Sequence, residues 1–125
     1  MTKKIIQPLN AIAKRGLSLF DESLYRIDPK SKNPDGIILR SYNLHDTTLS
    51  SKVKAIARSG AGVNNIPVED CTKQGIVVFN TPGANANAVK ELVLTMLMAS
   101  SRHLFEGVSW ARTLREQGEQ IPQLV

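Results

Sequence analysis

Residues 55–87 read AIARSGAGVNNIPVEDCTKQGIVVFNTPGANAN. This pattern predicts a strand at Ala55–Arg58, a turn at Gly60–Gly62, a short helix over Val68–Gln74 between a proline and a glycine, and a strand at Ile76–Phe79. Glycines let the main chain take unusual dihedral angles and approach a ligand without an intervening Cβ. Successive amides in such a turn form a concave anion-binding site. We therefore expect this turn to bind a small, doubly anionic organic acid.

Two arginines stand at predicted strand ends and are candidates for binding this acid. Arg58 closes the strand before the glycine turn, and Arg40 follows an apolar strand at Gly36–Leu39. Guanidinium groups form strong, charge-assisted hydrogen bonds with carboxylates and phosphates. The neighbouring turn favours a functional role for Arg58, whereas Arg40 is equally well explained as an exposed strand end. The turn is not a dinucleotide fingerprint, because Asn65 stands where the third glycine should be.

The rest of the chain alternates strand and helix patterns. Further strands are predicted at Ile5–Leu9, where Pro8 breaks the pattern, and at Leu24–Ile27. Helices are predicted over Asn10–Phe20, Thr48–Lys54, 87–102 and 105–116. Five strands separated by helices predict an α/β fold with a doubly wound, flavodoxin-like parallel sheet.

Helix ends are predicted from asparagines. Asn10 is expected to cap the first helix, and Asn85 or Asn87 the long one. The long helix is apolar on most sides, which predicts that it is buried in the domain or against a partner.

Ligands of open parallel sheets bind beyond the carboxyl ends of the strands. In this chain the residues at those ends are Asn10, Arg40-Ser41, Arg58-Ser59-Gly60 and Asn80-Thr81-Pro82. The candidate anion-binding groups therefore fall on one edge of the sheet.

Composition excludes several other functions. The 125 residues carry a net charge of +5, but the basic residues are scattered and no nucleic-acid-binding motif is present, so we expect no nucleic-acid partner. The longest apolar run is too short to span a bilayer, and no membrane partner is expected. One cysteine, Cys71, suits a reducing cytoplasm. The lone histidines His45 and His103 suggest no metal site.

The segment ARSGAGVNNIPVEDCTKQGIVVFNTPGANANAVKEL resembles the substrate-domain signature of the D-isomer-specific 2-hydroxyacid dehydrogenases, and within them the phosphoglycerate dehydrogenase branch. The resemblance implies an NAD-dependent parent enzyme of serine biosynthesis. Such an enzyme oxidises 3-phospho-D-glycerate to 3-phosphohydroxypyruvate, and a homo-oligomer is expected for it.

The resemblance also implies roles for particular residues. The amides of Gly60, Ala61 and Gly62 would bind the substrate carboxylate, and Ala61 would also lie against the nicotinamide end of NAD. Arg40 and Arg58 match phosphate-binding arginines of the family. The residues expected to bind substrate are Arg40, Ser41, Arg58, Ser59, Gly60, Ala61, Gly62 and Asn85. Some relatives have another arginine at the place of Tyr42, so this chain has one cation fewer there.

The family's nucleotide-binding turn and its catalytic arginine, glutamate and histidine have no match in this sequence. We therefore expect residues 1–103 to form a substrate-binding domain, and residues 104–125 to form a helix and the start of a linker to an absent NAD-binding domain. No catalytic residue is expected, and the chain alone should be inactive. The alternative is a non-catalytic module of the same fold that senses a small acid or binds another protein.

Overall fold

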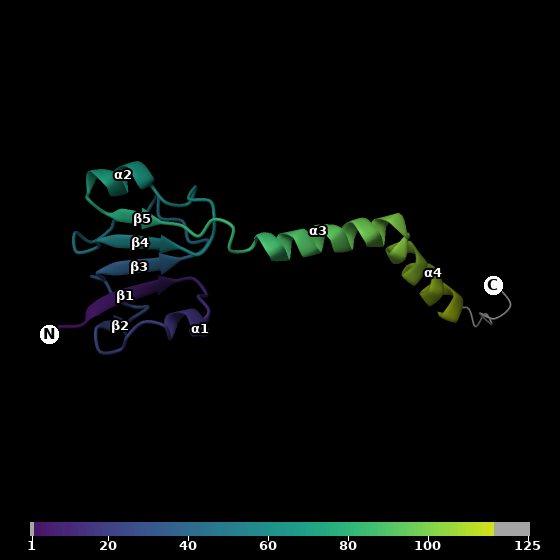
Figure 1. Ribbon diagram of the computed structural model, residues 1–125, viewed down its shortest axis with the longest axis horizontal. Helices are drawn as coiled ribbons and strands as arrows, with labels where there is room; N and C mark the ends of the chain where they lie inside the picture. The colour runs from purple at the N-terminus through teal and green to yellow at the C-terminus, as the bar shows by residue number, and fades with distance from the viewer. Residues whose placement is uncertain (1, 117–125) are drawn as a thin grey trace. The chain divides into compact units, whose positions relative to one another are not determined.

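The computed structural model describes residues 2–116 of the chain. These residues fall into two compact units, which divide between Ala84 and Asn85. Figure 1 shows a sheet in the first unit and two helices in the second. The predicted boundary between a substrate-binding domain and a linker helix, after residue 103, is a boundary of function. The boundary between the two compact units does not test it.

The first unit contains five parallel strands in the order β2-β1-β3-β4-β5. In chain order they are β1 (Lys4–Leu9), β2 (Tyr25–Ile27), β3 (Gly36–Leu39), β4 (Ala55–Arg58) and β5 (Val77–Phe79). This is the flavodoxin-like, doubly wound order, so the predicted α/β fold is confirmed. After β1 the chain continues to β2 on one side of the sheet, and after β3 it continues to β4 on the other side. The gap between the carboxyl ends of β1 and β3 is therefore the topological switch point.

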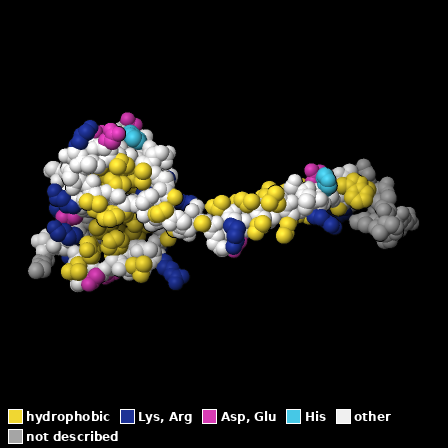
Figure 2. Space-filling model, turned by 45° about the horizontal axis from the view of Figure 1, so that its top comes forward, with side chains coloured by type: hydrophobic (Ala, Val, Ile, Leu, Met, Phe, Trp, Pro, Cys, Tyr) yellow, Lys and Arg dark blue, Asp and Glu magenta, His cyan; other side chains and the backbone are white. Residues whose placement is uncertain are grey.

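The core lies on one face of the sheet. Ile37 and Leu39 of β3 and Ile56 of β4 point to this face and are buried. The connections that follow these strands supply the other buried side chains of this hydrophobic cluster, which are Leu44, Val53, Ile66, Cys71 and Ile76. On the opposite face Val77 and Phe79 of β5 are exposed. Figure 2 shows hydrophobic side chains gathered on the surface of this unit.

Pro8 lies inside β1, so the predicted break in this strand is wrong. The carbonyl of Ile6 faces β2, because it accepts the amide of Asp28 at 3.0 Å, and Pro8 faces the same way two residues later. β2 ends at Ile27, so the amide that a proline lacks would have no strand partner there.

Two predicted helices are wrong. In place of a helix over Asn10–Phe20, only the single turn α1 (Lys14–Leu17) forms. Asn10 does not cap it, because its φ of 68° is left-handed and its side chain bonds elsewhere. No helix forms over Thr48–Lys54, a segment of residues with poor helix propensity that instead turns and buries Val53.

The helix α2 (Val68–Lys73) confirms the prediction from the flanking proline and glycine. Gly75 has a φ of 69°, and its amide donates to Thr72 while the amide of Ile76 donates to Cys71. These two bonds form a Schellman motif, which satisfies carbonyls that the helix end leaves free. The motif turns the chain directly into β5.

The second unit consists of α3 (Ala86–Ser101) and α4 (Leu104–Glu116). Ala99 and Leu114 are its buried side chains. Of the two predicted cap residues, Asn85 is the N-cap of α3 and Asn87 lies inside the helix, although the side chain of Asn85 makes no capping hydrogen bond. The large apolar residues of α3 are exposed in the single chain, so the predicted burial in the domain is not seen, and burial against a partner stays a prediction. These residues are Val89, Leu92, Val93, Leu94, Met96, Leu97 and Met98. The segment after residue 116 lies outside the described residues.

Candidate substrate-binding site

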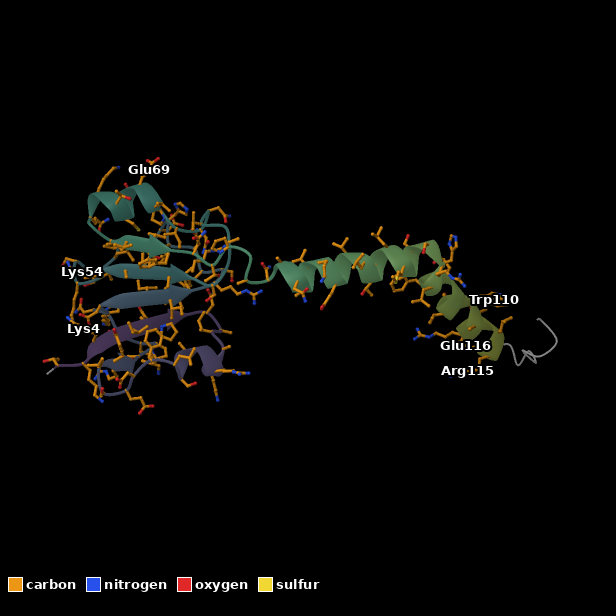
Figure 3. The ribbon with its side chains drawn as sticks, in the orientation of Figure 1. Lys4, Lys54, Glu69, Trp110, Arg115 and Glu116 are labelled. Carbon is orange, nitrogen blue, oxygen red and sulfur yellow. The ribbon has the colours of Figure 1, made fainter. Side chains whose placement is uncertain are left out.

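The candidate site lies at the edge where the parallel strands end, as the arrowheads in Figure 1 show. Leu39 of β3 pairs with Arg58 of β4, so the residues that follow each strand leave the sheet side by side. Lys4 and Lys54 mark the opposite edge, where β1 and β4 begin (Figure 3). The predicted gathering of the candidate groups on one edge is therefore confirmed for the first unit.

Arg58 lies against the glycine turn. Its Nε donates a hydrogen bond to the main-chain carbonyl of Arg40 at 3.1 Å. A Cβ at Gly60 would lie 2.9 Å from Nη1 of Arg58, and a Cβ at Gly62 would lie 3.5 Å from the same atom. The guanidinium therefore occupies the space that a side chain at residue 60 would need.

These distances explain why the turn contains glycine. Neither Gly60 nor Gly62 has a positive φ, so the expectation of unusual dihedral angles is wrong for both. The expectation of close approach without a Cβ holds, but the group that approaches Gly60 is the side chain of Arg58. At residue 60, glycine is required for space and not for backbone freedom.

The main chain of the turn is held from both sides. The amide of Ser59 donates to the Leu39 carbonyl at 2.8 Å, and the amide of Thr81 donates to the Gly60 carbonyl at 3.0 Å. The side chain of Asn80 donates to the Ala61 carbonyl at 2.7 Å. The end of β5 thus binds the turn through the carbonyls of its glycine and alanine.

Two amides of the turn remain available. The amide of Gly60 donates to the Arg58 carbonyl at 3.0 Å, whereas those of Ala61 and Gly62 donate to no group in residues 2–116. Adjacent free amides in a fixed turn form a concave site for an anion. This arrangement agrees with the expected role of the two amides but does not test it.

The electrostatics of the edge favour an anion. Within the described residues, neither Arg40 nor Arg58 forms a salt bridge. Arg40 is exposed and Arg58 is half-buried. The guanidinium of Arg58 lies beside the glycine turn and pairs with no carboxylate among residues 2–116, so it can attract a carboxylate or a phosphate.

The structure gathers seven of the eight predicted substrate residues at this edge: Arg40, Ser41, Arg58, Ser59, Gly60, Ala61 and Gly62. The eighth, Asn85, belongs to the other unit, and its role stays a prediction. The side-chain hydroxyls of Ser41 and Ser59 make no hydrogen bond among residues 2–116, which leaves them available to a ligand.

Sequence reasoning placed Asn10, Asn80 and Thr81 at this edge, but it missed the hydrogen bonds by which they and Asn65 support the site. The Oδ1 of Asn10, which was expected to cap a helix, accepts the amide of Ser41 at 3.2 Å and joins the ends of β1 and β3. Asn65 bonds the loop that follows β3. Asn80 and Thr81 hold the glycine turn. For Asn10, Asn80 and Thr81 the only signal in the sequence was their place just after a strand, and Asn65 had no such signal.

The residues of this turn do not fit the diphosphate of a dinucleotide. Gly62 is followed by a loop, and α2 begins only at Val68 and has six residues, whereas a dinucleotide site places its glycine turn directly at the start of a helix. Across residues 2–116, no three histidine, cysteine, aspartate or glutamate side chains gather as metal ligands. No helix in these residues is long and apolar enough to cross a membrane.

The first unit is a doubly wound α/β domain whose strand-end edge has two free amides and the guanidinium of Arg58. Residues 4–118 match the family described as D-isomer specific 2-hydroxyacid dehydrogenase, catalytic domain. The chain therefore belongs to this family of oxidoreductases, which act on 2-hydroxy acids.

Particular relatives differ in the substrate that their names give. The chain is 44% identical over 73 residues to a D-3-phosphoglycerate dehydrogenase of Synechocystis sp., a match that covers 56% of this chain and 13% of the relative. It is 30% identical over 120 residues to a glyoxylate reductase of Thermococcus litoralis, covering 82% of this chain and 36% of the relative. The chain thus spans well under half the length of these relatives.

A solved structure also resembles the chain. It is the NAD+-bound 3-phosphoglycerate dehydrogenase of Entamoeba histolytica, with a TM-score of 0.59 and 28% sequence identity, and the match covers 78% of this chain and 39% of that one. This likeness supports NAD use in the family.

Proposed function

We propose that this chain is the substrate-binding part of an NAD-dependent D-3-phosphoglycerate dehydrogenase. The parent enzyme would oxidise 3-phospho-D-glycerate to 3-phosphohydroxypyruvate in serine biosynthesis, in the cytoplasm. Residues 1–103 would form the substrate-binding domain, and residues 104–125 would lead to the NAD-binding domain. The chain by itself would not turn over substrate.

One observation carries the proposal. The guanidinium of Arg58 lies in the glycine turn, and among residues 2–116 no carboxylate pairs with it. A positive group held in place without a counter-ion is costly in isolation and favourable once an anion binds. A 2-hydroxy acid with a phosphate has two anionic groups, which matches two kinds of donor at this edge.

Each kind of donor takes one end of the substrate in this scheme. The amides of Ala61 and Gly62 hold the carboxylate, and the guanidinium groups of Arg58 and Arg40 hold the phosphate. The hydroxyls of Ser41 and Ser59 offer further hydrogen-bonding groups at this edge, and Asn85 stays a predicted substrate-binding residue. Holding both ends fixes the carbon that carries the reacting hydroxyl, which is the contribution of a binding domain to catalysis.

NAD supplies the hydride acceptor when the parent enzyme binds it. This chain would touch the nicotinamide end only at Ala61, and the rest of the cofactor would be held outside the chain. The acid–base group that takes the hydroxyl proton would also lie outside it. The assignment of the cofactor follows from the poor fit between the turn and a dinucleotide diphosphate. That of the acid–base group follows from the resemblance, because the family's catalytic histidine has no match in this sequence.

The names of the relatives suggest glyoxylate as a second candidate substrate. A glyoxylate reductase matches this chain over a longer stretch than the phosphoglycerate dehydrogenase does. Tyr42 also stands where some relatives have an arginine, which removes one possible phosphate ligand. Glyoxylate lacks a phosphate and would leave the Arg58 guanidinium without its ligand, so the free cations favour the phosphorylated acid.

The test is a titration of the uniformly ¹⁵N-labelled 125-residue chain, followed by two-dimensional NMR. We expect 3-phospho-D-glycerate to shift the amide signals of Ala61 and Gly62 and the Nε–H signal of Arg58. D-Glycerate should shift the two amides, and inorganic phosphate should shift mainly the Arg58 signal. The variant Arg58→Lys keeps the charge but loses the planar, two-pronged donor, so it should lose the preference for the phosphorylated acid.

The results of this titration distinguish between the proposed function and its alternatives. No shift at residues 58–62 with any of these acids would contradict the proposal. Equal affinity for glyoxylate and 3-phospho-D-glycerate would reject the phosphorylated substrate and retain the family. A sensing module would bind its acid equally well, so the discriminating measurement is restored NADH formation when the nucleotide domain of a homologous dehydrogenase is fused after residue 125.

A further inference from the structure

Asn65 links two loops at the edge of the sheet through its side-chain amide. Its Nδ2 donates to the carbonyl of Tyr42 at 2.7 Å and to the carbonyl of Arg40 at 3.4 Å. Its own main-chain carbonyl accepts the amide of Leu44 at 2.9 Å. The loop after β4 is therefore bound to alternate residues of the loop after β3.

The carbonyl of Arg40 has two donors at once. Nδ2 of Asn65 and Nε of Arg58 both point at this oxygen, at 3.4 Å and 3.1 Å. Because Nε lies in the plane of the guanidinium, the position of the carbonyl sets the orientation of the whole donor group of Arg58. A side chain that fixes the carbonyl thus acts on Arg58 without touching it.

The side chain of Asn65 lowers the stability of the fold at one of its atoms, which packing alone does not explain. Its Oδ1 is buried and accepts no hydrogen bond from the described residues. A buried acceptor without a donor lowers the stability of the folded state. An apolar side chain of the same size would avoid this loss, so what the asparagine contributes is the position of its NH₂ group.

We propose that Asn65 is a positioning residue for the phosphate end of the substrate. It holds the Arg40 carbonyl where that oxygen orients the guanidinium of Arg58 over the glycine turn. This inference rests on the proposed function, because it assumes that Arg58 binds a phosphate. It assigns no contact between Asn65 and the ligand.

Asn65 should affect the preference of the site for 3-phospho-D-glycerate over D-glycerate. Loss of the Asn65 donor should weaken the binding of 3-phospho-D-glycerate, which needs an oriented Arg58. D-Glycerate binds through the amides of Ala61 and Gly62, so its affinity should be nearly unchanged. A purely structural role would weaken both ligands alike, because both depend on a folded edge.

The test variant is Asn65→Leu, which is neutral, similar in size and has no donor. Its affinity for 3-phospho-D-glycerate, relative to that for D-glycerate, should fall about tenfold, the effect of losing one hydrogen bond to a charged group. The NMR signal of the Arg58 Nε–H should move towards that of a free arginine. Asn65→Gln retains an amide donor and should recover part of the ratio.

Val78→Ala is the matched control, since the side chain of Val78 packs against the core and has no hydrogen-bonding group. It should lower stability and leave the affinity ratio at the wild-type value. If leucine prevents folding, Asn65→Ala gives the same comparison. An unchanged ratio and an unchanged Arg58 signal in the donor-free variant would overturn the role of Asn65 alone, whereas a wild-type chain that binds neither acid would overturn the proposed function as well.

Discussion

The side chain of Arg58 and the main chain of Arg40 are joined by a hydrogen bond of 3.1 Å, although 18 residues separate them in sequence. This bond holds the guanidinium of Arg58, at the end of β4, against the main chain that follows β3. The group is therefore fixed in the turn before any ligand arrives. A donor that is already oriented loses less conformational entropy on binding than a free side chain.

The variant Gly60→Ala should displace Arg58 with little loss of stability. The new Cβ would lie 2.9 Å from Nη1, which is the movable end of a side chain. Affinity for 3-phospho-D-glycerate, measured by calorimetry, should fall about tenfold. In the control Gly62→Ala the nearest atoms would lie at 3.4 and 3.5 Å, an ordinary contact, so affinity should stay near the wild-type value. Equal affinities of the two variants would disprove this account of the turn.

The carboxylate of Asp35 should make the fold sensitive to acid. It accepts the amide of Ile5 at 2.8 Å and lies 3.3 Å from Nζ of Lys4 and 3.2 Å from Nζ of Lys52. Burial raises the pKa of Asp35, but the hydrogen bonds from Ile5, Lys52 and Lys4 outweigh it, so the net pKa lies below its ordinary value of 3.8. Its contribution to stability is complete above that ordinary value and is lost as the pH falls through the lower, folded-state pKa.

The check is urea unfolding of Asp35→Ala as a function of pH. At neutral pH the variant should be less stable by about 1.5 kcal/mol, the low end for hydrogen bonds to a charged group because both lysines are largely exposed. The difference should shrink in acid, where the wild-type carboxylate is protonated. Asp35→Asn keeps an acceptor for Ile5, so it should lose less. A difference that grows as the pH falls would contradict the assignment.

Gly75 should tolerate no side chain without a cost. Its φ of 69° is left-handed, and Gly75→Ala should lower the free energy of unfolding by about 1–2 kcal/mol. Gly16 in α1 has no positive φ and no atom within 4 Å of a new Cβ, so Gly16→Ala should be neutral or slightly stabilising. Urea unfolding of both variants measures the contrast, and equal effects would argue against the Schellman motif.

The thiol of Cys71 should be inert in the folded chain. Its side chain is buried in the core, and this burial, together with the nearby charge of Asp70, raises the pKa of the thiol. Alkylation by iodoacetamide at neutral pH should therefore follow unfolding and should speed up in urea. Rapid modification without denaturant would show that α2 does not hold Cys71 against the core in solution.

Local sequence patterns predicted the elements in which propensity and packing agree. The apolar run Gly36–Leu39 forms the central strand with the predicted bounds, and the proline and glycine around α2 mark its position. The predicted helix over Asn10–Phe20 failed because it relied on Asn10 as a cap. That side chain bonds Ser41 instead, and a short isolated helix is marginal without tertiary support.

The order of strands and helices in the sequence was enough to place the anion-binding candidates on one edge, because parallel strands bring their carboxyl ends together. Only the tertiary structure decided which groups meet there. The bonds of Arg58 with Arg40, Asn65 with Tyr42 and Ser41 with Asn10 join residues 18, 23 and 31 positions apart. Such contacts depend on how separate loops approach in space, and periodicity and propensity describe only neighbours along the chain.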